Sequence, residues 1–135
     1  MTYTKRISDM NFDVIIIGGG AAGLMAAFAA AQNGNDVTVI ERNERMARKV
    51  MITGKGRCNV TNNCDVNSLI ANTPKNGKFL YSAFNNFTSA DTMTYFESMG
   101  VPLKTERGNR VFPVSDKAVD IVDALVKTAK KQGAK

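Results

Sequence analysis

Histidine is absent from this 135-residue sequence, and cysteine occurs only twice. Without histidine, neither a Ser-His-Asp nor a Cys-His catalytic unit can be assembled, and zinc or non-haem iron sites lose their commonest ligand. Cys58 and Cys64 have five residues between them, which fits neither CxxC redox spacing nor a metal-binding pattern. We therefore expect no metal site and a reducing, cytoplasmic location, and no side chain is assigned as a catalytic acid or base.

Long hydrophobic runs are also scarce. No residue from Val14 to Ala31 is charged, but this stretch is at the lower length limit for a membrane span and contains three consecutive glycines. Lys5 and Arg6 upstream give it a superficial likeness to a signal peptide, but a secreted protein would leave Glu41 and the strand before it unexplained. We expect no membrane association, a disordered leader at residues 1–12 and one domain at residues 13–135.

The charge balance is basic, with a net charge of +6 and a pI near 9.5. Such a balance is compatible with nucleic acid, an anionic membrane surface or an anionic ligand such as a diphosphate. The cluster from Lys127 to Lys135 favours a solvated helix end, where the helix dipole stabilises positive charge.

The most informative segment runs from Asp13 to Glu41. A short apolar run there is broken by Gly18, Gly20 and Gly23, and an Ala-rich helix is predicted over Ala21 to Asn33. A second strand is predicted at Val37 to Ile40, with Glu41 at its C-terminal tip. This order of strand, glycine turn, helix and strand is the context that a dinucleotide-binding fingerprint requires.

Each residue of the fingerprint has a physical role. Gly18 allows a tight turn, Gly20 lets a diphosphate approach the backbone, and Gly23 lets the helix pack close to the strand. The helix start near Ala21 then offers unpaired N–H groups and a positive dipole end. Glu41 is expected to accept hydrogen bonds from ribose hydroxyls, and its charge makes a 2′-phosphate, and hence NADP, the less favoured occupant.

Residues 42–63 have no sustained period and are too long for an idle connection. Gly54 and Gly56 permit close approach to a flat ligand. The polar and positively charged side chains of this segment include Arg48, Lys49, Thr53, Lys55, Arg57, Asn59, Thr61 and Asn62. Such a set suits a heteroaromatic ring with carbonyl and imide edges beside a diphosphate.

Two motifs carry a resemblance to a known family: DVIIIGGGAAGLMAA at residues 13–27 and ARKVMITGKGRCNVTN at residues 47–62. Together with GNRVFPVSDKAVDIVDAL at residues 108–125, they resemble the bacterial flavoproteins described as NAD(P)/FAD-dependent oxidoreductases, aminoacetone oxidase-like or bile-acid reductase-like. The resemblance implies FAD, non-covalent because no histidine can hold it, with NAD(P)H as a possible electron donor. It also implies that this chain is the N-terminal portion of a longer protein.

The resemblance assigns cofactor contacts position by position. It places Gly18, Gly20, Ala21, Ala22 and Gly23 at the pyrophosphate, and Glu41 and Arg42 at the adenosine end. It places Arg48, Lys49, Thr53, Gly54, Arg57, Cys58 and Asn59 near the diphosphate and the isoalloxazine. The sequence departs from the family at Ala47 and Lys55, where glycine is common, and at Thr53, where serine is common.

Two side chains in the second motif each have a structural and a functional interpretation. Lys55 either faces solvent or points at the N1–C2=O edge of the flavin, where it would stabilise the reduced anion. Cys58 either packs as a small residue or takes a covalent or redox role, and packing is favoured.

Further along the chain, periodicity predicts helices and one hairpin. Phe79, Leu80, Ala83, Phe84 and Phe87 share one face of a helix over Lys78 to Phe87, which favours a core position for these aromatics. Thr88 or Ser89 can cap a helix ending at Gly100, and Ser115–Asp116 can start another. Leu103 to Phe112 reads as a hairpin around residues 107–109, whereas Asn59 to Gly77, with six asparagines, reads as irregular.

We therefore expect an α/β fold: a Rossmann-like FAD-binding βαβ unit with following helices and a short β-hairpin, forming an incomplete doubly wound domain. The expected function is that of an FAD-dependent oxidoreductase that transfers hydride to or from a small-molecule substrate. Two alternatives remain open. One is a nucleic-acid-associated flavoprotein, in keeping with the positive charge, and the other is a non-catalytic dinucleotide-binding module.

Overall fold

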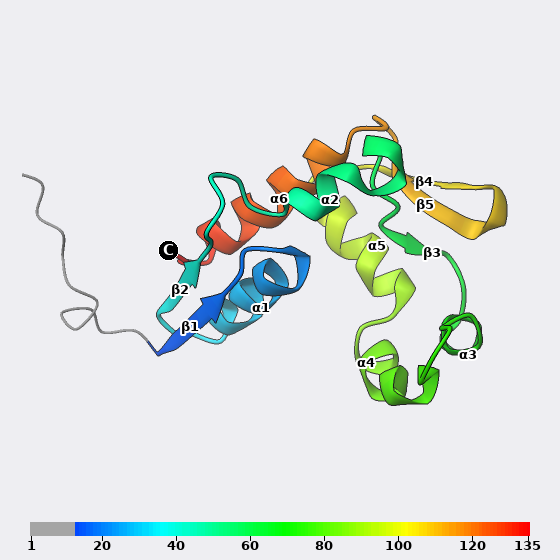
Figure 1. Ribbon diagram of the computed structural model, residues 1–135, viewed down its shortest axis with the longest axis horizontal. Coiled ribbons are helices and arrows are strands. Elements are labelled where there is room, and N and C mark those ends of the chain that lie inside the picture. Colours follow the sequence, from blue (N-terminus) through cyan, green and yellow to red (C-terminus); the bar gives the residue numbers. More distant parts are fainter. Residues whose placement is uncertain (1–12) are drawn as a thin grey trace, which may run out of the picture. The chain divides into compact units, whose positions relative to one another are not determined.

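The computed structural model describes residues 13–135, so the leader expected at residues 1–12 lies outside the described part of the chain. The chain divides into two compact units, one formed by residues 13–48 with 125–135 and the other by residues 49–124. Figure 1 labels the elements of both.

The first unit contains the predicted strand, helix and strand. Strand β1 (Val14–Ile17) and strand β2 (Val37–Ile40) pair in parallel, and helix α1 (Ala21–Gln32) connects them. The register sets Val14 beside Val37 and Ile17 beside Ile40. Because parallel strands need a crossover between them, this arrangement confirms the βαβ prediction.

Two glycines fix how closely α1 approaches β1. Gly18 has φ +102°, a conformation that residues with a Cβ rarely adopt. A Cβ at Gly23 would lie 1.9 Å from the carbonyl oxygen of Gly18, so only glycine fits there. Leu24 and Ala27 follow on α1 and are fully buried, at 1% and 0% exposure. The glycine spacing thus brings the apolar side of the helix into the core of this unit.

The free edge of β2 is extended by Lys135. Its N–H donates to Val37 O at 3.0 Å, and its carbonyl accepts from Val39 N–H at 2.8 Å, which is the pattern of a parallel ladder. An ion pair of 3.0 Å between Lys135 Nζ and Asp36 adds to this contact. Helix α6 (Ala118–Lys131) precedes it, so the segment after α6 lies along the edge of β2.

The second unit contains an antiparallel sheet in the order β3-β5-β4. Its strands are β3 (Thr61–Asn62), β4 (Leu103–Glu106) and β5 (Arg110–Pro113). The turn between β4 and β5, residues 107–109, has left-handed φ angles at Gly108 and Asn109. These angles permit the sharp reversal, and the predicted hairpin is confirmed.

Helix α5 (Ser89–Ser98) begins at a capping box. Thr88 Oγ1 accepts from the N–H of Asp91, and the Asp91 carboxylate accepts from the N–H of Thr88. The sequence predicts this cap at Thr88 or Ser89, and the structure shows that it is Thr88. Helix α6 begins at Ala118, two residues later than Asp116, because Asp116 has a left-handed φ of +57° that no helix can contain.

Two expectations for the second unit were wrong. The stretch from Asn59 to Gly77, expected to be irregular, contains β3 and helix α3 (Val66–Ala71), which is capped by the Asp65 side chain. The expected helix over Lys78 to Phe87 is split into a 3-10 turn at Gly77–Leu80 and helix α4 (Tyr81–Asn86).

The aromatic side chains of this split helix are not in the core. Phe79 is 86% exposed and Phe87 is 43% exposed. A helical period shows which residues share a face but not whether another element covers it, and within the described residues these side chains remain open.

Candidate functional site

The glycine turn and the start of α1 form an open, amide-lined surface. Gly20 precedes α1 in an extended conformation, and among residues 13–135 no side chain caps the first turn of the helix. A Cβ at Gly20 would meet no atom within 4 Å. Ala21 and Ala22 are exposed. The positions assigned to a pyrophosphate therefore lie together at the positive end of a 12-residue helix.

Glu41 lies beside this turn, at the tip of β2. Its Oε2 accepts a hydrogen bond of 2.8 Å from the N–H of Gly19, and its Oε1 accepts one of 2.8 Å from the N–H of Asn43. The Asn43 side-chain amide also donates to Oε1. The Asn43 N–H, followed by the Gly19 N–H and the Asn43 amide, lowers the pKa of Glu41 below its ordinary value. The carboxylate is thus held in its charged form at the mouth of the turn.

The chain after Glu41 folds back onto the same turn. Ala47 N–H donates to Gly19 O at 2.8 Å, and Ala47 is buried with φ +53°. Met46 lies so close that a Cβ at Gly19 would come within 3.0 Å of its Cγ. Together these contacts fix the segment from Glu41 to Ala47 against the glycines.

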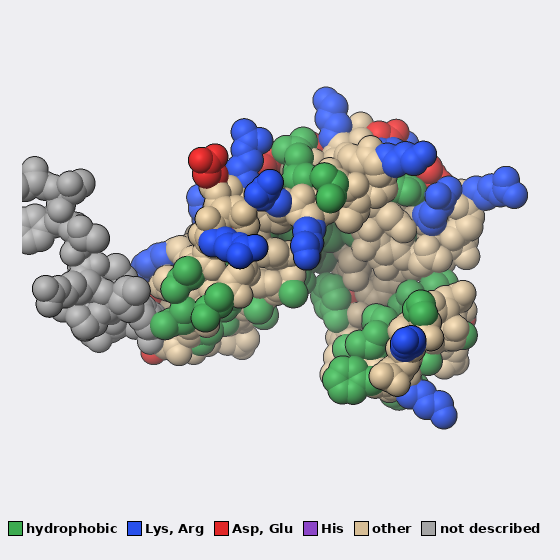
Figure 2. Space-filling view, in the orientation of Figure 1, with side chains coloured by type: hydrophobic (Ala, Val, Ile, Leu, Met, Phe, Trp, Pro, Cys, Tyr) green, Lys and Arg blue, Asp and Glu red, His purple; other side chains and the backbone are tan. Residues whose placement is uncertain are grey.

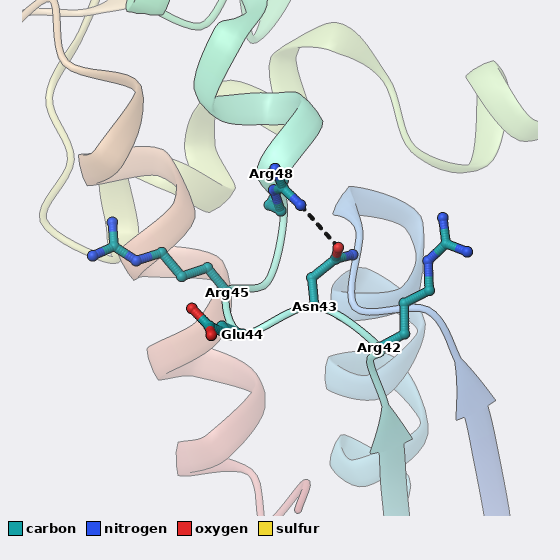
Figure 3. A pocket seen from close by; sticks show the side chains of 5 residues that line it. All are labelled: Arg42, Asn43, Glu44, Arg45 and Arg48. Carbon is teal, nitrogen blue, oxygen red and sulfur yellow. Dashed lines mark hydrogen bonds between the residues drawn. The ribbon is translucent and has the colours of Figure 1, made fainter.

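An arginine-rich cavity of about 430 Å³ lies in this returning segment. It is lined by Arg42, Asn43, Glu44, Arg45 and Arg48 (Figure 3). Figure 2 shows Lys and Arg side chains gathered over the part of the molecule between β2 and α2 (Arg48–Ile52). We call the cavity lined by Arg42, Asn43, Glu44, Arg45 and Arg48 the arginine cavity. Sequence reasoning named Arg42 and Arg48 but missed Asn43 and Arg45, whose one signal was their position just after Glu41.

The second motif, from Lys49 onward, lies in the second unit and turns through left-handed backbone. Gly54, Lys55, Gly56 and Cys58 have φ angles of +55°, +58°, +84° and +60°. Consecutive residues in this region produce a tight loop, and non-glycine residues are strained there. Thr53 starts the loop, with its hydroxyl donating to Val50 O at 2.7 Å, and Lys49 and Lys55 are exposed.

Arg57 is committed to carboxylates within its own unit. Its guanidinium contacts Glu106 Oε1 at 2.5 Å and donates to Asp116 Oδ1 at 2.8 Å. It also stacks on Phe112 at 4.1 Å from the ring centre. Lys104 contacts Asp116 at 2.7 Å, which completes a cluster of two cations and two anions. Arg57 therefore ties the loop to the hairpin and to the residues before α6.

These ion pairs shift the acidic groups. Arg57 lowers the pKa of Glu106, and Lys104, followed by Arg57, lowers the pKa of Asp116. Glu106, followed by Asp116, raises the pKa of Arg57. All four side chains stay charged at neutral pH, and the cluster carries no net charge.

Cys58 and Asn59 also have structural roles. Cys58 is buried, its N–H donates to Thr53 O at 3.0 Å, and burial raises the pKa of its thiol. The Asn59 amide, in the orientation that satisfies its neighbours, donates to Val111 O at 3.1 Å and Thr61 O at 2.9 Å. Cys64 is likewise a free thiol. These contacts support the packing interpretation of Cys58.

In residues 13–135, no group of three His, Cys, Asp or Glu side chains is arranged to hold a metal ion. Over the same residues, no helix combines the length and apolar character needed to cross a bilayer.

Comparison with known proteins identifies relatives for most of this chain. It is 35% identical over 123 residues to a 3-dehydro-bile acid delta(4,6)-reductase of Clostridium scindens, covering 89% of this chain and 29% of that protein. It is 34% identical over 122 residues to a ribosomal RNA dihydrouridine synthase of Escherichia coli, covering 90% and 30%. The chain thus spans less than a third of the length of these relatives.

The fold and the family agree with these matches. The structure resembles that of THI4 from Thermovibrio ammonificans, with a TM-score of 0.58 and 19% identity over 91% of this chain and 36% of that one. Residues 12–135 match the family described as HI0933-like protein Rossmann domain. The relatives include a reductase, so the chain is related to oxidoreductases. The resemblance read from its two motifs is confirmed: the chain belongs to the HI0933-like protein Rossmann domain family.

Proposed function

We propose that this chain binds FAD non-covalently and forms the cofactor-binding portion of a flavin-dependent oxidoreductase. The observation that supports this most directly is the hydrogen bond between Gly19 N–H and the Glu41 carboxylate at the open start of α1. It brings an acceptor for ribose hydroxyls next to the N–H groups that suit a diphosphate. Gly20, with no atom near its missing Cβ, leaves room for that approach.

Different residues of the first unit would contact different parts of the cofactor. The start of α1 would bind the diphosphate, and Glu41 would bind the ribose. In the arginine cavity, Arg42 would contact the adenosine end and Arg48 would contact the charged phosphates. In the second unit, the exposed Gly54 and Gly56 present backbone on either side of Lys55, and bare backbone suits a flat ring. Lys49 and Thr53 remain proposed contacts there.

Bound FAD supplies hydride transfer, and the chain supplies orientation and electrostatics. The names of the relatives favour reduction of a carbon–carbon double bond: one is a delta(4,6)-reductase and another makes dihydrouridine. Such a reduction adds one hydride and one proton to the substrate. We propose NAD(P)H as the source of the electrons, a small molecule with a conjugated double bond as the substrate, and the cytoplasm as the location.

The cofactor can be identified directly. Protein equilibrated with FAD should bind a yellow compound with the absorbance and mass of FAD, and the bound colour should bleach with dithionite. A protein that takes up no flavin when supplied with an excess of FAD would refute the proposal. Bleaching by NADH or NADPH then tests the electron donor.

A second candidate is a reductase that acts on a base in RNA. The ribosomal RNA dihydrouridine synthase of Haemophilus influenzae is 32% identical over 126 residues, in addition to that of Escherichia coli. The net charge of +6 is in keeping with a polyanionic substrate. Salt-dependent binding of ribosomal RNA fragments, measured beside binding of a conjugated steroid ketone, distinguishes the two candidates.

A further inference from the structure

Asn43 connects Glu41, at the tip of β2, to Arg48 in the arginine cavity. Its Nδ2 donates to Glu41 Oε1, and its Oδ1 accepts a hydrogen bond of 3.0 Å from Arg48 Nη1. Figure 3 shows the second of these bonds, with Asn43 between Arg48 and the strand tip that precedes Arg42. One neutral side chain therefore contacts both charged groups.

A side-chain amide can make both contacts at once. A carboxylate accepts hydrogen bonds and cannot donate them, whereas a guanidinium donates and cannot accept. Asparagine does both, so it satisfies Glu41 with its NH₂ group and Arg48 with its carbonyl. Within the described residues, no ion pair joins Glu41 directly to Arg48. Each group therefore keeps its charge available for another partner.

Both groups also keep unused hydrogen-bonding capacity. Glu41 Oε2 accepts one hydrogen bond, from Gly19 N–H, and a carboxylate oxygen can accept two. Arg48 is exposed and uses one of the five N–H groups of its guanidinium in the contact with Asn43. A nucleotide could thus add a ribose hydroxyl to the first and a phosphate oxygen to the second without breaking the contacts of Asn43.

We propose that Asn43 is a positioning residue that holds Glu41 toward the ribose and Arg48 toward the phosphate of one nucleotide ligand. This inference rests on the proposed function, and it adds a specificity-determining residue that the fingerprint does not contain. It makes a defined statement about selectivity: the preference for a ribose 2′-hydroxyl depends on Asn43, although Asn43 itself does not touch the ribose.

The test compares ADP with 2′-deoxy-ADP. These nucleotides differ only in the 2′-hydroxyl, from which Glu41 would accept a hydrogen bond. Binding to the purified protein is measured by isothermal titration calorimetry. We expect the unaltered protein to prefer ADP by about tenfold, the effect of one hydrogen bond to a charged group. Asn43→Leu should weaken both nucleotides through Arg48 and weaken ADP further through Glu41, so the ratio should fall toward one. Asn85→Leu removes a comparable surface bond, to Tyr81 O, and should leave the ratio unchanged.

A second substitution guards against misfolding of the first. Asn43→Asp keeps the acceptor for Arg48 but loses the donor to Glu41 and adds a like charge beside it, so it should lower the ratio as well. Circular dichroism checks that each variant is folded. Equal weakening of both nucleotides, or an unchanged ratio in both variants, would overturn the role of Asn43.

The remaining outcomes separate this inference from the proposed function. An unaltered protein that binds both nucleotides equally shows that Glu41 does not read the ribose, which overturns the inference even if FAD is released from the protein. An unaltered protein that binds neither nucleotide and takes up no FAD refutes the inference and the proposed function together.

Discussion

At the scale of single residues, the backbone explains two departures from the family pattern. Ala47 and Lys55 stand where the resemblance leads us to expect glycine, and both have left-handed φ angles, +53° and +58°. A residue with a Cβ is strained in this region, by about 1–2 kcal/mol. The preference for glycine at these positions is therefore a requirement of the loop backbone, whichever ligand the loop contacts.

Lys55→Gly should stabilise the protein by about 1 kcal/mol, because it relieves left-handed strain and the exposed lysine gives up no buried surface. Urea unfolding measures the change. Lys127→Gly is the matched control: it is an exposed lysine inside α6, where glycine should destabilise by about 1 kcal/mol. If both variants lose stability, Lys55 is not in the left-handed region in solution.

Glu41 should make stability depend on pH. Because hydrogen bonds lower its pKa in the folded state, the carboxylate stabilises the fold at pH values above its ordinary pKa of 4.5. That contribution is lost as the pH falls below 4.5 and through the lower folded-state value. Glu41→Gln should therefore be less stable than the unaltered protein at pH 7, and the difference should shrink on acidification.

Thermal unfolding from pH 7 down to pH 3 measures this convergence. Glu97→Gln alters an exposed glutamate of α5 and serves as the control. A gap between the Glu41→Gln and unaltered proteins that stays constant over this range would show that the carboxylate is not held by Gly19 and Asn43.

At the scale of elements, two glycines of the same turn should behave in opposite ways. A Cβ at Gly23 would lie 1.9 Å from Gly18 O, whereas one at Gly20 would meet nothing within 4 Å. Gly23→Ala should thus destabilise the first unit by about 3 kcal/mol, as overpacking against backbone does. Gly20→Ala should leave stability unchanged but weaken ADP binding about tenfold, since a methyl group would stand where the diphosphate approaches.

Urea unfolding and ADP titration of the two variants provide the measurements. The two variants separate an effect on folding stability from an effect on ADP binding, because each serves as the control for the other. Unchanged ADP affinity in Gly20→Ala would place the diphosphate away from the glycine turn.

Elements set by local sequence were the ones that could be predicted. The strands and helix around Gly18 to Gly23, the cap at Thr88 and the hairpin turn at Gly108 each depend on residues a few positions apart. The ion cluster of Arg57 could not be predicted in this way, since Glu106 and Asp116 are 49 and 59 residues away along the chain. Phe79 was misjudged for a related reason: what covers a helix face is a long-range property.

The candidate site shows the same division. The glycines and Glu41 belong to one spacing pattern, and the structure brings them together. The place of Asn43 and Arg45 in the site follows only from the structure, in which the chain after Glu41 folds back on Gly19. Arg57, named for its charge, proved to be engaged with carboxylates, which a charge pattern alone does not reveal.

At the scale of the whole molecule, the sheet of the first unit has an apolar face that the described residues leave open. Ile15, Ile17 and Ile40 are 44%, 87% and 45% exposed. The register sets Ile17 beside Ile40, and Ile15 shares their face because side chains alternate along a strand. Exposed apolar side chains on a short parallel sheet favour self-association.

The purified 135-residue chain should therefore associate with increasing concentration and bind FAD weakly. Ile17→Lys should reduce the association, because it places a charge on the apolar face at its most exposed side chain. Ile52→Lys, at a position that is 76% exposed in α2, is the matched control and should have a smaller effect. Light scattering coupled to size-exclusion chromatography measures the mass. A monodisperse monomer with stoichiometric flavin would contradict this expectation.

The commitment of Arg57 to distant carboxylates has a consequence for the order of folding. Closing a loop between residues 57 and 116 costs chain entropy that local contacts do not cost, so these pairs are expected to form late. During synthesis, the second motif would emerge from the ribosome well before Asp116. It would lack these ion pairs until the hairpin and the start of α6 had been synthesised. Pulse-labelling of amides during refolding would show this as protection of the Cys58 N–H that arises together with the hairpin and not before it.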